Sequence, residues 1–360
     1  MNGNSFKINK LKTYKYSKIV RFWLVIVLIM LIGQVLLNGI SSLTGSDLSI
    51  TKWDITPKII PPIGKQQWND VFELYKQTPQ FNSINSELTL KKFKNVFFWE
   101  YFYKIWKYNL WTIILIPFIF FTITKKIDWY LIKFFFIVVI LAVLTASTKL
   151  ITNMFDNANQ LWFSAYQSAL QFLFAILTIG TIVKIISYVY NFENKSNTDQ
   201  SKFTLFLMII TFIQLILSGL MSSMRASLRF PTWPSMNGKV IPEVLSNRAN
   251  WTLHNLTNYE SFDFAPALVQ FSHRFIAYTI LILTMFYYFK KRNNTYTRAI
   301  KWLTFTYTLV LFHVFLGILT LIKSKTDIPV LFTLLHQLTG LLFFVSLLFL
   351  HLSLKKNRIK

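Results

Sequence analysis

The sequence predicts an all-α integral membrane protein in which eight transmembrane helices form two pseudo-symmetric four-helix bundles. Composition is the first reason: 53% of the 360 residues are hydrophobic, 14% are charged, and the mean hydropathy is +0.43, which leaves too little polar surface for a soluble domain. The second reason is a series of apolar runs, each close to the length of about 20 residues that crosses a bilayer. The third is a repeat of short motifs between the two halves of the chain.

The apolar runs define the expected helices in order. They cover residues 20–40, 97–124, 129–148, 163–190, 203–224, 264–289, 300–322 and 328–351. The first run has no small-residue cleavage site, so we expect a retained helix and not a signal peptide. The second run starts with an amphipathic stretch before its most apolar part.

Basic residues give the chain a formal net charge of +24, and they cluster in short segments between the apolar runs. This placement fits phospholipid head groups better than nucleic acid. With eight spans, the basic N-terminus, C-terminus and connecting loops fall on one side, which predicts that both termini are cytoplasmic. The long loops 41–96 and 225–263 then lie outside, where their Pro, Trp and Asn content suggests ordered caps. The absence of cysteine excludes disulfides and thiolate metal sites.

Short motifs recur in the two halves at offsets of 165 to 180 residues. The matching positions are Gly39 with Gly219, Trp53 with Trp233, Tyr103 with His273, and Gln171 with His336. Each half has an even number of spans, so we expect parallel repeats related by an axis along the membrane normal. Residues 1–200 would form the N-terminal bundle and residues 201–360 the C-terminal bundle.

Ionisable groups within hydrocarbon are costly, and they are therefore the first candidates for function. The chain has five histidines. His254 falls in an outer loop and His351 at the inner edge of the last helix, where we expect solvated or interfacial side chains.

His273 and His336 lie eight or nine residues in from the outer ends of their expected helices, at a common depth of about 12 Å. Two imidazoles at one depth are what six-coordinate haem iron requires, and Arg274 could meet a haem propionate. The alternative is that each histidine hydrogen-bonds a neighbouring helix. His313 has a similar depth, and could be a ligand, a partner of a ligand or a packed core residue.

Glu100 is the other intramembrane candidate, near the outer end of the second expected helix. It shares a helix face with Tyr103, three residues later. A carboxylate among aromatic walls could move protons. The alternative is a salt bridge to Lys104 or Lys107, or solvation at the membrane interface.

These residues occur within motifs that resemble the haem A synthase family over most of the chain, from about Trp23 to Leu350. The matching stretches are Gly39–Trp53, Pro61, Pro62, Trp68, Phe72, Tyr75, Thr78, Pro79, Phe93, Lys94, Trp99–Tyr101, Arg225, Ala226, T-W-P-S-M-N-G-K-V-I-P at Thr232–Pro242, V-Q-F-S-H-R at Val269–Arg274, L-G-I-L-T-L at Leu316–Leu321, and His336–Gln337.

The resemblance implies an oxidoreductase of a bacterial inner membrane that serves cytochrome oxidase biogenesis. The reaction it implies is oxidation of one ring methyl group of haem O, through a hydroxymethyl stage, to the formyl group of haem A. It also implies a haem b cofactor between His273 and His336, and a substrate site in the N-terminal bundle with Glu100 as its glutamate. A haem O synthase is the partner that the resemblance suggests, and a homo-oligomer is compatible with it.

The chain departs from the family pattern on the substrate side. The family's E-x-x-H-R motif reads Glu100–Lys104 here, with Tyr103 in place of histidine and Lys104 in place of arginine. The second N-terminal histidine falls on Gln171, and Ser42 replaces an arginine of the first loop. A tyrosine oxygen can ligate ferric iron, whereas a glutamine amide is a poor ligand.

Three interpretations follow from these departures. The chain oxidises haem O at a weakly ligated or open substrate iron; or it binds haem b for electron transfer or assembly without making haem A; or it is a degenerating relic. A channel or secondary transporter is an alternative of a different class, which would place polar residues along a midplane path. Few such residues occur at mid-depth here. The electron acceptor and the oligomeric state are not indicated by the sequence.

Overall fold

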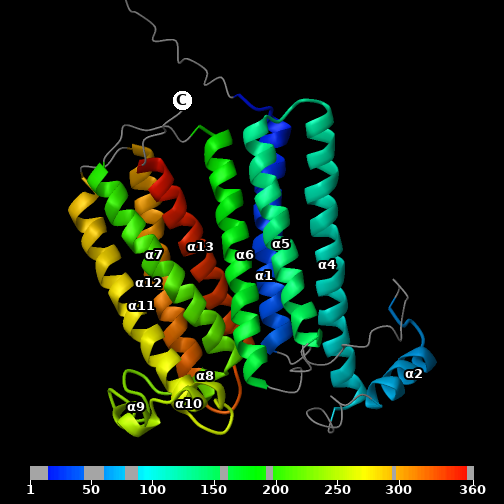
Figure 1. Cartoon of the computed structure of the whole chain (residues 1–360), viewed down its shortest axis with the longest axis vertical. Coiled ribbons are helices and arrows are strands. Elements are labelled where there is room, and N and C mark those ends of the chain that lie inside the picture. The colour runs from blue at the N-terminus through cyan, green and yellow to red at the C-terminus, as the bar shows by residue number, and fades with distance from the viewer. Residues whose placement is uncertain are drawn as a thin grey trace, which may run out of the picture.

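The computed structural model describes residues 15–43, 61–77, 88–154, 161–191, 198–293 and 297–354. Long helices run side by side through this part of the chain (Figure 1). They are α1 (Lys18–Leu43), α4 (Leu90–Ile123), α5 (Trp129–Met154), α6 (Leu161–Val189), α7 (Thr198–Ser223), α11 (Phe264–Lys291), α12 (Thr297–Lys323) and α13 (Val330–Leu354). Eight helices of the described residues are long and apolar enough to cross a membrane, which confirms the predicted all-α, multi-pass membrane protein.

Helix α4 starts at Leu90, seven residues before the predicted span. Thr89 caps it, because its side chain accepts a hydrogen bond from the Lys92 backbone N–H. The added turns pack against the short helix α2 (Lys65–Lys76), where the ring of Phe93 lies 5.1 Å from that of Phe72. This packing explains the amphipathic start of the predicted span, because one face of the first turns of α4 covers α2.

The 225–263 loop is an ordered cap at the end of the bundle where α2 also lies (Figure 1). It contains α8 (Ala226–Arg229), α9 (Glu243–Ser246), the 3-10 helix η3 (Arg248–Asn250) and α10 (Leu253–Thr257). The predicted ordered cap is therefore confirmed for this loop, and its place on the outer side stays a prediction. In the first loop, residues 44–60 and 78–87 lie outside the described residues, and with them most of the Gly39–Trp53 motif.

The opposite end of the bundle holds the start of α1, the α4–α5 connection, the end of α6, the start of α7 and the end of α13 (Figure 1). Lys15 Nζ lies 2.6 Å from Asp128 Oδ2, and this ion pair ties the start of α1 to the α4–α5 connection. These basic segments therefore share one side, as the charge pattern requires. That this side is cytoplasmic stays a prediction.

The contacts between the described helices are compatible with two parallel repeats. In the second half α7, α11, α12 and α13 form a closed ring, and in the first half α1 packs against α4 and α6, with α5 on α6. Contacts between the halves join α1 to α13, α7 to α6, and α6 to α13. A two-fold axis that relates the halves would exchange the α1–α13 contact with the α7–α6 contact. It would map the α6–α13 contact onto itself. The division into domains at residue 200 stays a prediction.

Two glycines show the same correspondence in detail. A Cβ at Gly39 of α1 would collide with the side-chain amide of Gln337 on α13, and a Cβ at Gly219 of α7 would lie 3.3 Å from the ring of Phe172 on α6. Gln337 directly follows His336, and Phe172 directly follows Gln171. The two halves therefore meet next to His336 on α13 and next to Gln171 on α6, the candidate residues in the fourth helix of each half.

Candidate functional site

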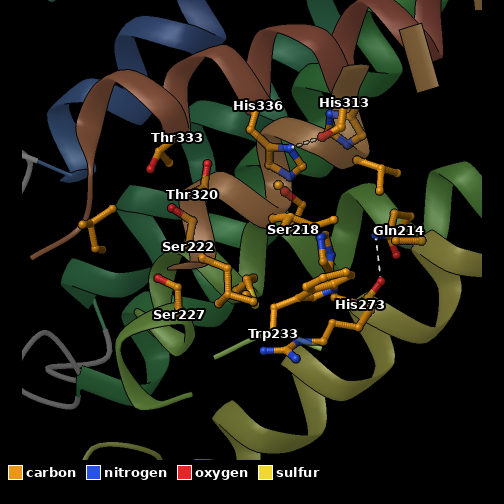
Figure 2. Close-up of a pocket in the computed structure, with 18 of the residues that line it drawn as sticks. Gln214, Ser218, Ser222, Ser227, Trp233, His273, His313, Thr320, Thr333 and His336 are labelled. Carbon is orange, nitrogen blue, oxygen red and sulfur yellow. Dashed lines mark hydrogen bonds between the residues drawn. The ribbon is translucent and has the colours of Figure 1, made fainter. Parts of the chain in front are cut away.

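A cavity of about 150 Å³ lies between α7, α11, α12 and α13, and it brings three of the predicted histidines together (Figure 2). His273 comes from α11, His313 from α12 and His336 from α13. Their side chains are partly accessible because they border this cavity. Apolar side chains such as Met221 and Val314 supply much of the remaining wall.

The rings of His273 and His336 face each other across the cavity. Their centroids are 6.5 Å apart and their planes make an angle of 69°. Two imidazoles bound to opposite faces of one metal ion, with metal–nitrogen bonds of about 2 Å, have centroids about 6 Å apart. The pair therefore fits a haem iron, whose macrocycle supplies the other ligands. The structure thus brings together the two residues for which the sequence predicts a common depth.

His313 takes a different position, stacked on His336. The two ring centroids are 4.0 Å apart and the planes differ by 1°. Coplanar stacked rings cannot bind one iron from opposite faces. Of the three roles left open by the sequence, this geometry excludes His313 as the axial partner of His336.

A hydrogen bond orients the ring of His336, whereas the bond found at His273 is to its main chain. His336 Nδ1 lies 3.0 Å from the main-chain oxygen of His313, so it carries a proton and donates it, which leaves Nε2 with the free lone pair (Figure 2). Gln214 of α7 donates to the main-chain oxygen of His273 at 3.0 Å. Gln214 Oε1 and His273 Nδ1 are buried and have no hydrogen-bond partner among the described residues.

Arg274 is engaged mainly with the loop that follows α8. Its guanidinium donates to the main-chain oxygens of four residues at 2.8 to 3.3 Å: Phe230, Thr232, Pro234 and Ser235. Trp233, in the middle of this segment, donates from Nε1 to the hydroxyl of Tyr278 at 2.9 Å, and all three side chains border the cavity. Arg274 thus holds a loop over the site. A hydrogen bond from Arg274 to a haem propionate stays a prediction. Among the donor groups of Arg274, only Nε–H has no partner among the described residues.

Glycines make room for the two stacked rings. A Cβ at Gly317 of α12 would lie 2.8 Å from Cε1 of His336, and a Cβ at Gly340 of α13 would lie 2.9 Å from Cε1 of His313. Real Cβ atoms do not approach so closely in a packed interior, so a side chain at either position must displace the ring beside it.

We expect Gly317→Ala to reduce bound haem and to lower the free energy of unfolding by about 1–3 kcal/mol through overpacking. The matched control is Gly180→Ala in α6, where the nearest atom to the new Cβ is 3.8 Å away. That control should be neutral or slightly stabilising, because alanine favours the helix. The measurements are the haem-to-protein ratio and thermal unfolding in detergent. Equal values for the two variants would contradict the assigned role of Gly317.

Comparisons with known proteins show the family to which this chain belongs. The family model COX15-CtaA, described as cytochrome oxidase assembly protein, matches residues 21–348. The protein named heme A synthase from Pelagibacter ubique is 30% identical over 337 residues, which cover 91% of this chain and 94% of that protein. The protein of the same name from Bartonella quintana is 29% identical over 336 residues, which cover 91% of this chain and 90% of that protein. The chain belongs to the haem A synthase family. This membership argues against the transporter alternative.

The substrate-side positions of this haem A synthase family member lie on α4 and α6. Tyr103 and Lys104 are partly buried in α4. Gln171 of α6 donates from Nε2 to the hydroxyl of Thr148 on α5 at 2.9 Å. Glu100 belongs to α4 by its backbone, and its side chain lies outside the described residues. The proposed roles of these residues are not tested by the structure.

The remaining histidines lie away from the cavity of the haem A synthase family site. His254 is exposed in α10, as expected. The expectation for His351 is wrong: its side chain is only 6% exposed, and its Nδ1 lies 3.0 Å from the hydroxyl of Thr204 on α7. The end of α13 is covered by α7, which the position of His351 in its apolar run did not reveal.

Sequence reasoning gave no role to four residues that support the site: Gln214, Gly317, Thr339 and Gly340. One signal could have found Gln214. Its counterpart at the offset of 180 residues is Gln34 on α1, and the side-chain oxygens of both are buried without a hydrogen-bond partner among the described residues. A polar side chain repeated at the same place in two apolar helices is costly, and therefore points to function.

Proposed function

We propose that this protein is a haem A synthase. It would oxidise a ring methyl group of haem O to the hydroxymethyl and then to the formyl group of haem A, for cytochrome oxidase biogenesis. The observation that carries the proposal is the pair His273 and His336, with ring centroids 6.5 Å apart across a cavity, in a chain that belongs to this family.

The cofactor of the C-terminal half is haem b, held between His273 and His336. When bound, it supplies one-electron redox chemistry and so a way out for electrons removed from the substrate. The protein's own contribution is orientation. The main-chain oxygen of His313 fixes Nδ1–H of His336, and Trp233 of the loop held by Arg274 supplies part of the cavity wall.

Haem O binds in the N-terminal half, beside Tyr103 and Gln171. Glu100, on the same helix face as Tyr103, moves protons released at the methyl carbon. Contact between Gln337 and α1 brings the haem b side close to this half. A haem O synthase delivers the substrate, and both termini lie on the cytoplasmic side of a bacterial inner membrane.

A second candidate is a haem b protein for electron transfer or assembly that lacks synthase activity. One observation favours it: Gln171, a poor iron ligand in any case, already bonds Thr148 of its own half. This candidate keeps the same cofactor site and differs only on the substrate side.

The deciding experiment identifies the haems in protein purified from a host that makes haem O. We expect haem b together with haem A or its hydroxymethyl precursor, measured by chromatography and mass spectrometry. Haem b alone, with haem O present in the host membranes, would support the second candidate. Absence of haem b would contradict both.

A further inference from the structure

His313 and His336 form a unit that spans two helices. Their rings stack at 4.0 Å with parallel planes, and each ring lies against a glycine of the opposite helix: His336 against Gly317 and His313 against Gly340. The reciprocal glycines let α12 and α13 approach closely at this level. Neither ring can tilt without meeting the other ring or main-chain atoms of the facing helix.

The hydrogen bonds of this unit fix the tautomer of His336 and favour one tautomer of His313. The hydroxyl of Thr339 lies 2.9 Å from Leu335 O and 3.0 Å from His336 O, so its single proton is shared with main-chain acceptors. With the proton so placed, its oxygen accepts from His313 Nδ1, which is 3.0 Å away. His336 Nδ1 donates in turn to the main-chain oxygen of His313. The Nε2 atom of each neutral ring is thereby left unprotonated.

We propose that His313 is a positioning residue, which holds the imidazole plane of His336 so that Nε2 points at the haem iron at a fixed angle to His273. The inference rests on the proposed function, since it presupposes haem b at His273 and His336. Orientation and hydrogen bonding of an axial histidine set the affinity, spectrum and potential of the metal. His313 would act on all three without touching the iron.

The test compares His313→Ala with His313→Phe in the full-length protein purified with its haem. His313→Ala removes the stacked ring and keeps the main-chain acceptor, whereas His313→Phe restores a flat ring without nitrogen. The readouts are the electron paramagnetic resonance signal of the ferric haem, its midpoint potential, and the rate of haem transfer to apomyoglobin. His351→Ala, a buried histidine of α13 away from the cavity, is the control.

For His313→Ala we expect a six-coordinate haem with an altered resonance signal and potential, and haem transfer on the order of tenfold faster. His313→Phe should return the resonance signal towards wild type. Thr339→Val removes the acceptor for His313 Nδ1, and it should shift the midpoint potential in the same direction as His313→Ala. If His313→Ala does not fold, Thr339→Val tests the positioning role of His313 in its place.

Two results would overturn the inference alone. In one, the resonance signal and potential of His313→Ala match those of His351→Ala. In the other, His313→Ala loses six-coordination as His336→Ala does, which would make His313 a ligand. A wild-type protein without bis-histidine haem would instead overturn the proposed function, and this inference with it.

Discussion

Replacing His336 with alanine should abolish the six-coordinate low-spin haem of the purified protein. The variant loses an axial ligand, and it also leaves the ring of His313 without its stacking partner and the His313 main-chain oxygen without its donor. Disturbing a residue behind a metal ligand already costs about 10–100-fold in affinity, so loss of the ligand should cost more. The measurement is the reduced-minus-oxidised spectrum together with the haem-to-protein ratio.

His273→Ala should have the same effect, because the two rings are the facing pair. The control is His351→Ala, which removes another hydrogen-bonded histidine from α13, 15 residues from His336, or about 22 Å along the helix. An unchanged low-spin spectrum in His336→Ala would refute the ligand assignment. A five-coordinate spectrum in either variant would support it.

The eight spans could be predicted because an apolar run is a property of the sequence alone. The same holds for His273 and His336, since few ionisable residues occur within the runs and their depths follow from the helix rise. The limits appear at His313 and His351. Whether a histidine faces a cavity, a neighbouring ring or another helix depends on how each helix is rotated about its axis, and uniformly apolar helices carry little information on that rotation.

Arg274 shows the same limit at closer range. From its place beside His273, the sequence suggested a propionate partner. The propionate contact stays a prediction, and the structure gives the guanidinium four main-chain acceptors in residues 230–235, an irregular segment that depends on outside donors. Part of the T-W-P-S-M-N-G-K-V-I-P motif is thus explained as a loop whose main-chain oxygens accept hydrogen bonds from Arg274 of α11. The motif also contains a tight turn at Asn237 and Gly238, whose φ angles are both positive.

We therefore expect Arg274→Ala to release this loop. Hydrogen bonds from a charged donor contribute about 1.5–3 kcal/mol each, and several acceptors lose their partner at once, so the loop should be destabilised by on the order of 3 kcal/mol. Trypsin cleavage at Lys239, in the same loop, should become about tenfold faster or more, and haem should be lost more readily. Arg274→Lys should be intermediate, because one ammonium cannot reach all four oxygens.

Arg292→Ala is the matched control, since it removes an arginine from the far end of the same helix, where the side chain is exposed. It should leave both cleavage and haem content at wild-type values. The two roles considered for Arg274 predict different results. A clamp on the loop requires cleavage at Lys239 to rise in the apoprotein as well as in the haem-bound protein. A residue that serves mainly the propionate would, when replaced, weaken haem binding and leave cleavage of the apoprotein unchanged, and that result would exclude the clamp.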